Sequence, residues 1–145
     1  MGKVEIGDAG SDSAALSDHK AFLFDKEKNL LVIPARVVKQ DARTGTKNGG
    51  IPPQVWYGAY VFGVNPDTGF VLRGTVEHGT AGNGYYWYGS SPNEVKRSLY
   101  IGDTLHTLSS AKILADPLSP INITIATITL DGKDEVLYPE MRMMV

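Results

Sequence analysis

Two segments of this chain, residues 18–34 and 96–108, consist largely of aliphatic and aromatic residues on either side of a short break. In the second segment the break is Gly102-Asp103, which suits a two-residue hairpin because glycine accepts the positive φ that such turns need. In the first segment the polar residues 26–29 separate two apolar runs. Each segment therefore predicts a β-hairpin. Because so few polar residues interrupt the strands, we expect both of their faces to be covered, as in stacked sheets.

The middle of the chain predicts a further hairpin. Residues 58–64 and 70–76 are two apolar runs joined by a short segment that contains proline and glycine, which are typical turn residues. Gly58, Gly63 and Gly74 lie within these runs, and a glycine inside a strand often marks a bulge or a close approach of the backbone.

Residues 121–130 alternate in polarity, and the parity changes after Ala126, which indicates a bulge in another strand. Helical periodicity is almost absent from the whole chain. The sequence therefore predicts an all-β fold of about eight short strands, paired as successive antiparallel hairpins. Such a set could form a sandwich, a barrel or the blades of a propeller.

Composition excludes several classes of function. The chain has 145 residues, enough for one domain, with 14 basic and 16 acidic residues and a net charge of -2, so we expect no nucleic-acid partner. It has no cysteine, and therefore no disulfide or thiolate metal site. Its apolar runs are too short to cross a bilayer, so no direct membrane insertion is expected. The first residues lack the apolar stretch of a signal peptide, which would have to lie outside this chain.

Three segments of the sequence resemble a known protein family. Residues 18–34, 58–62 and 97–109 occur in the order found in the C-terminal part of the secreted, archaeal-type β-propeller proteins, which are distantly similar to WD40 repeats, and the resemblance covers residues 16–130. It implies an exported or cell-surface propeller protein without an assigned activity. Members of that family are several times longer, so this chain resembles only their last blades.

The resemblance implies about two propeller-type blades in residues 16–138. Residues 1–15 would then form a linker or an extra edge strand, and residues 139–145 a tail. Two blades cannot close a ring of about four to eight. Either the chain is a fragment of a longer protein, or a short homologue completes its sheets by forming a homo-oligomer.

Aromatic residues beside two long polar segments are the candidate ligand site. Trp56 and Tyr57 follow one segment, and the other contains a compact run bracketed by glycines, namely Tyr85, Tyr86, Trp87 and Tyr88. Aromatic rings offer rigid apolar area with polar edges, which suits a glycan or a protein partner. The alternative interpretation is that these rings pack the interface between sheets.

No catalytic or metal-binding residue is predicted. The histidines His19, His78 and His106 lack the short spacing of a zinc site, and no cofactor is expected. Ser17, Asp18 and His19 cannot form a triad, because adjacent strand residues point to opposite faces. The sequence thus favours a binding or scaffolding module. The alternative is part of a glycan hydrolase whose catalytic acids lie outside this chain.

Overall fold

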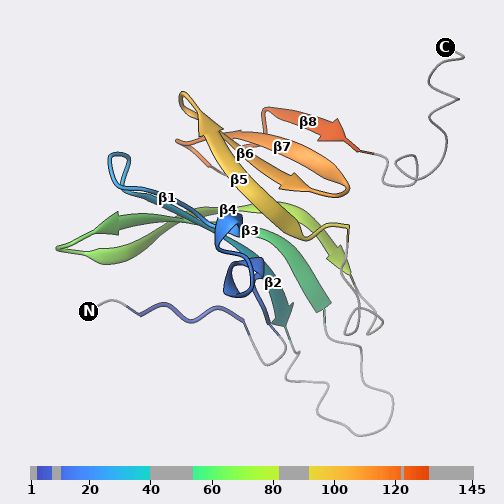
Figure 1. Cartoon of the computed structure of the whole chain (residues 1–145), viewed down its shortest axis with the longest axis horizontal. Helices are drawn as coiled ribbons and strands as arrows, with labels where there is room; N and C mark the ends of the chain where they lie inside the picture. Colours follow the sequence, from blue (N-terminus) through green and yellow to red (C-terminus); the bar gives the residue numbers. More distant parts are fainter. Residues whose placement is uncertain (1–2, 8–10, 40–53, 82–91, 122, 131–145) are drawn as a thin grey trace, which may run out of the picture.

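The computed structural model describes residues 3–7, 11–39, 54–81, 92–121 and 123–130. They form two four-stranded antiparallel sheets that pack face to face (Figure 1). The first sheet has the order β1 (Leu23–Asp25), β2 (Leu30–Lys39), β3 (Gln54–Asn65) and β4 (Gly69–Ala81); the second has the order β5 (Val95–Ile101), β6 (Thr104–Ser109), β7 (Lys112–Pro117) and β8 (Ala126–Thr129). The predicted all-β fold of successive hairpins is confirmed.

Local turn chemistry forms the three predicted hairpins. Between β1 and β2, the Asp25 carboxylate accepts a hydrogen bond from the Lys28 backbone N–H at 2.8 Å, and Asn29 has a φ of 50°. Between β3 and β4, Gly69 has a φ of 73°, and between β5 and β6, Gly102 has a φ of 60°. These positive values favour glycine and asparagine, so the sequence specifies each turn directly.

Two parts of the predicted strand pattern are wrong. Residues 18–22 do not begin a strand, because the Asp18 side chain accepts a hydrogen bond from Lys20 N–H and caps a short 3-10 helix, η2 (His19–Ala21). A second 3-10 helix, η1 (Ala14–Leu16), precedes it. The second error is in the predicted strand of residues 121–130. Residues 123–125 lie outside the strands, after β7. At the first place the polar Asp18 cap redirected the chain.

Glycine permits close backbone approach at Gly58. A Cβ there would lie 2.1 Å from the Val76 carbonyl oxygen and 2.4 Å from the Trp56 ring. The β3–β4 register also shifts between Tyr57 and Gly58, and again between Val61 and Phe62, opposite Gly74. The predicted irregularities at Gly58 and Gly74 are therefore present in this hairpin.

The core lies between the sheets. It is built from inward-facing aliphatic residues of both sheets and from Ile121 in the segment before β8: Leu30, Val32, Ala59, Val61, Val76, Val95, Leu105, Leu114 and Ile121. Burial of these side chains, at about 1.5–3 kcal/mol for each large one, is what holds the two sheets together.

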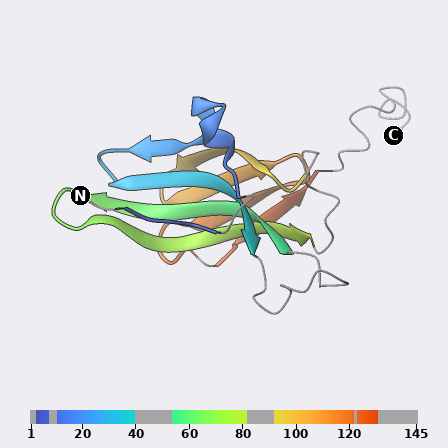
Figure 2. The same cartoon turned by 90° about the horizontal axis from the view of Figure 1, so that it is seen from below.

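The outer face of each sheet is only partly covered, which corrects the expectation that both faces of the strands are buried: Val37 and Phe62 are buried there, whereas Phe24 and Leu72 are exposed. Leu99 and Ile101 on β5 remain 40% and 68% exposed, since each sheet has only one sheet packed against it. Residues 3–7 run across the outer side of the first sheet (Figure 2), and Gly7 lies against Val37.

The N-terminal residues also extend the edge of the first sheet. Asp12 forms an isolated antiparallel bridge with Arg36 on β2, through backbone hydrogen bonds of 2.9 and 2.8 Å. Residues 139–145, the predicted tail, lie outside the described residues. No helix within the described ranges has the length and apolar character needed to cross a membrane.

Candidate binding surface

The structure places the predicted aromatic residues in different surroundings. Trp56 and Tyr57 are consecutive on β3, so their side chains point to opposite faces of the first sheet. Tyr57 is fully buried toward the second sheet, whereas Trp56 is half-buried on the outer face. Tyr85, Tyr86, Trp87 and Tyr88 lie outside the described residues. Trp56 is thus the described residue of the predicted set whose ring reaches the surface.

Trp56 begins a row of rings along the outer face. Its ring meets Tyr60 edge-on at 5.3 Å, Tyr60 stacks on Phe62 at 6.2 Å, and Phe62 meets Phe70 edge-on at 6.4 Å between ring centroids. Gly58 lies between Trp56 and Tyr60, and its missing side chain leaves room for the indole. Such pairs add about 0.5–1.5 kcal/mol each beyond area burial.

A second row crosses the same face from strand to strand. Phe24 pairs with Leu31, Leu31 with Phe62, and Phe62 with Leu72, so one outer row joins all four strands. Phe24, Phe70 and Leu72 are 53%, 43% and 52% exposed. We call this surface the aromatic face, and it consists of Phe24, Leu31, Trp56, Tyr60, Phe62, Phe70 and Leu72.

At the hairpin end of the aromatic face, the buried Phe62 is surrounded by exposed apolar side chains. Burial raises the pKa of the Tyr60 hydroxyl above its ordinary value. The nearby Arg73 guanidinium lies 3.5 Å from the Lys28 carbonyl oxygen and beside Gly63, whose register position belongs to the inner side. The cation therefore lies toward the inner side, and Phe24 and Phe70 are the rings of the aromatic face that stay about half exposed.

The outer side of the second sheet carries aliphatic side chains beside His106 and Arg97, and its described strands hold no aromatic row. Ile113 pairs with Ile128 and Leu108 with Ile113, so these residues form a line across β6, β7 and β8. Ile128 is 58% exposed. We call this surface the aliphatic face, and it consists of Leu99, Ile101, Leu108, Ile113 and Ile128.

Polar contacts between the sheets fix how they sit on each other. His78 on β4 is fully buried, and its ring nitrogens lie 3.1 Å from the Ser109 hydroxyl and 2.8 Å from the Thr107 hydroxyl, both on β6. Burial, followed by the nearby positive charge of Lys112, lowers the pKa of His78 to about 4, so the imidazole is neutral at pH 7. His78 therefore acts as a neutral hydrogen-bonding link.

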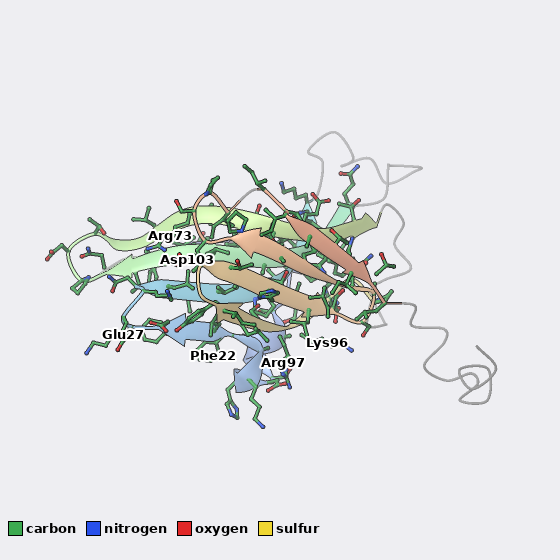
Figure 3. All side chains as sticks on the ribbon, turned by 90° about the horizontal axis from the view of Figure 1, so that it is seen from above. Phe22, Glu27, Arg73, Lys96, Arg97 and Asp103 are labelled. Carbon is green, nitrogen blue, oxygen red and sulfur yellow. The ribbon has the colours of Figure 1, made fainter. Side chains whose placement is uncertain are left out.

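At the edge formed by the first strands, charged and phenolic groups make a second link. Arg97 donates to the Asp18 carboxylate at 2.8 Å, and the Tyr100 hydroxyl donates to Asp25 (Arg97 is labelled in Figure 3). The backbone N–H of Lys20 and then Arg97 hold the pKa of Asp18 below its usual value. The hydrogen bond from the Tyr100 hydroxyl likewise holds the pKa of Asp25 below its usual value. Both carboxylates are therefore committed to structure.

An open hollow of about 370 Å³ near η1 is lined by Ala14, Asp18, Lys96 and Arg97. A smaller cleft lies beside η1. It has a volume of about 170 Å³ and is lined by Ser13, Pro34 and the charged residues Asp12, Arg36 and Glu94. The Arg36 guanidinium lies 3.9 Å from both carboxylates. Ligand pockets usually span about 300–1,000 Å³, so the flat faces are better candidates for binding than this cleft.

The three histidines lie in three separate places. His19 is on η2, His78 is between the sheets, and His106 pairs with Leu99 on the outer side of the second sheet. Within the ranges that the structure describes, no three His, Asp or Glu side chains gather as a metal-binding group.

Comparison with known families agrees with this architecture. The family model described as "Beta propeller domain" matches residues 1–120. The chain belongs to the Beta propeller domain family. No curated protein and no solved structure matches it significantly. The suspected resemblance and the prediction of partial propeller blades are thereby confirmed, and the two sheets of this Beta propeller chain do not close into a ring.

The family indicates a binding or scaffold module. Sequence analysis did not identify the aromatic face, because it considered aromatic residues beside long polar segments. The signal was present in the sequence of β3. Trp56, Tyr60 and Phe62 occupy alternate positions, with Gly58 between Trp56 and Tyr60, so all of them lie on the same face of the sheet.

Proposed function

We propose that this chain is a non-catalytic binding or scaffolding module of an exported or cell-surface β-propeller protein. Its ligand class is another protein, which docks on the aromatic face. One observation carries this proposal: Phe24, Phe70 and Leu72 are about half exposed in a continuous apolar row. A soluble chain that leaves such a row open has a surface suited to a partner.

The chemistry of the aromatic face fits a protein ligand better than a small molecule. Aromatic residues are enriched and charged residues depleted at the centres of protein interfaces. The ring row from Trp56 to Phe70 is rigid, because each ring packs on the next, so little side-chain entropy is lost on binding. A flat surface of this kind lacks the concavity that encloses a small ligand.

A surface glycan is the other ligand that the aromatic residues could take. The indole N–H of Trp56 and the hydroxyl of Tyr60 supply polar groups at one end of the row. The predicted platform of Tyr85, Tyr86, Trp87 and Tyr88 would add to it. Binding on a glycan array that is lost in Trp56→Ala and kept in Leu72→Glu would assign the role to a glycan in place of a protein.

The hydrolase alternative would draw its acids from blades outside this chain. Of the described carboxylates, burial raises the pKa of Asp116 above its ordinary value, as a general acid requires. That carboxylate is 1% exposed and accepts a hydrogen bond from the Thr124 hydroxyl at 2.8 Å. A substrate has no direct access to it, which favours a structural role.

Photo-crosslinking at two adjacent positions tests the proposal. Leu72 and Val71 are 52% and 51% exposed on β4, and their side chains point to opposite faces. Benzoylphenylalanine at position 72, introduced into the natural protein in its own cells, should give an adduct with one protein in the cell-surface fraction. Position 71 is the matched control and should not give this adduct.

Several results would contradict the proposal. They are equal adducts from both positions, no adduct from position 72, or release of reducing sugar by the purified chain that one carboxylate substitution abolishes.

A further inference from the structure

We propose that the partner of the aromatic face is the aliphatic face of a second copy of this chain, so that copies associate head to tail into a closed ring. This inference rests on the proposed function, because it names the protein that the aromatic face binds. It also assigns a role to the second outer surface, which the proposed function leaves unused.

The number of sheets gives the first argument. Propellers contain about four to eight blades around a central channel, and this chain supplies two four-stranded sheets. Rings of two, three or four copies would contain four, six or eight sheets, all within the range of known propellers. A second copy is thus a partner that both completes the architecture and is always present.

Continuity with the packing inside the chain gives the second argument. The first and second sheets already pack on each other through their inner faces, where Leu30 and Val61 meet Leu105 and Leu114 in one core. The outer faces are the opposite sides of these same sheets. A contact between the aromatic face and the aliphatic face of another copy would repeat the first-sheet-on-second-sheet arrangement, and such a heterologous contact closes into a ring when its rotation permits.

The two faces are chemically complementary. Large, rigid rings dominate the aromatic face, whereas the aliphatic face has branched side chains such as Ile113 and Ile128 with Ala115 and Ala126 in the adjacent row. In the described strand pairing of β5–β8, Arg97 is the charged residue on the outer side of the second sheet. Its charge is paired with Asp18 of the same chain. Little charge would therefore be desolvated when the two faces meet.

The size of the faces predicts a weak individual contact. Four strands about 4.8 Å apart and six residues long cover roughly 19 by 20 Å, or about 400 Å² of flat area. Counted over both partners this is about 800 Å², which lies below the roughly 1,200 Å² at which specific, stable interfaces begin. Association should therefore depend on concentration, while ring closure adds a second contact for each copy without a second loss of translational freedom.

Complementation between two variants tests the inference. Leu72→Glu places a charge on the aromatic face, and Ile128→Glu places one on the aliphatic face at a side chain that is 58% exposed. In sedimentation velocity, each variant alone should remain a single chain at concentrations where the unmodified chain associates. An equal mixture should form a dimer, because one intact face of each kind remains. Val71→Glu and Thr127→Glu, exposed and on the opposite sides, should associate like the unmodified chain.

Three outcomes would overturn the inference. The first is that the unmodified chain sediments as a single chain at every concentration. The second is that Ile128→Glu alone still dimerises, which would mean that two aromatic faces pair with each other. The third is that the mixture stays monomeric. Circular dichroism of each variant shows that its sheets are intact. If self-association fails while the crosslink at position 72 to a different protein persists, the proposed function stands and the ring is wrong.

Discussion

The layer between the two sheets and the two outer faces are both largely apolar, yet they differ in their polar contacts. Between the sheets, His78 links to Thr107 and Ser109, while Asp18 pairs with Arg97 at the first-strand edge. The aromatic face has ring contacts along its length but leaves Phe70 and Leu72 about half exposed. The inner layer therefore specifies one geometry, whereas the outer faces leave apolar side chains exposed.

This difference explains how one chain can hold a fixed pair of blades and still bind a partner. Apolar packing is nearly non-directional, and hydrogen bonds that would be left unsatisfied in a shifted arrangement give it direction. The inner layer combines both. Among the described residues the contacts on the aromatic face are mainly between rings, so a partner could dock there without breaking the hydrogen bonds of His78.

The largest effect on stability should come from the inner layer. Leu105 is fully buried in the core, so Leu105→Ala should lower the free energy of unfolding by about 2–5 kcal/mol. Ile101→Ala, at a side chain that is 68% exposed, should change it by less than about 0.5 kcal/mol for the monomer. Urea denaturation of dilute protein measures both. Equal losses would mean that the inner and outer layers are not distinct.

The hydrogen bonds of His78 should have the next largest effect. Thr107→Val keeps the shape of the side chain and leaves the His78 Nε2 atom without its partner, which should cost about 1–3 kcal/mol. Thr127→Val, on exposed β8, is the control and should be close to neutral. A neutral result for Thr107→Val would show that apolar packing alone orients the sheets.

The pKa of His78 predicts a loss of stability in mild acid. From its ordinary value of 6.5 down to about 4, the unfolded chain binds a proton on this imidazole that the folded chain does not. The free energy of unfolding should therefore fall as pH falls through this window, by at most about 1.4 kcal/mol per pH unit.

His78→Gln removes the titration, so the difference between the variant and the unmodified chain should shrink from pH 7 to pH 5 in urea denaturation. Burial raises the pKa of Asp116, and this group acts in the opposite direction in both proteins. It therefore cancels in the comparison. A difference that does not change with pH would contradict the assignment of a neutral, buried imidazole.

The smallest effect is expected from the exposed ion pair. Asp18→Asn keeps an oxygen that can cap η2 and removes the charge that faces Arg97. Because ion pairs at the surface contribute little, the thermal midpoint should hardly move. A large drop would show that this edge link, more than His78, joins the two sheets.

Much of the fold could be predicted because its signals are local. Gly102 and Asn29 have positive φ in their turns, and the residues that adopt such values are few. The family was also suggested from the phrases that form these hairpins, and the match over residues 1–120 confirms it.

The errors came from features that depend on neighbours. Asp18 was read as part of a strand because its role as a helix cap depends on the Lys20 backbone. The apolar content of β5 predicts coverage of both of its faces, but in the described residues a sheet packs on one face only. Trp56 and Tyr57 were grouped by sequence, although strand geometry sends one outward and the other into the core.

Sedimentation equilibrium of the unmodified chain over a wide range of concentrations tests the central claim most directly, namely that the outer faces bind and the inner layer only builds the fold. The account predicts a mass that rises with concentration toward a whole number of chains, and a mass that stays at one chain when Leu72→Glu is measured beside it. The mass of a single chain at every concentration, with no adduct from position 72 in cells, would contradict it.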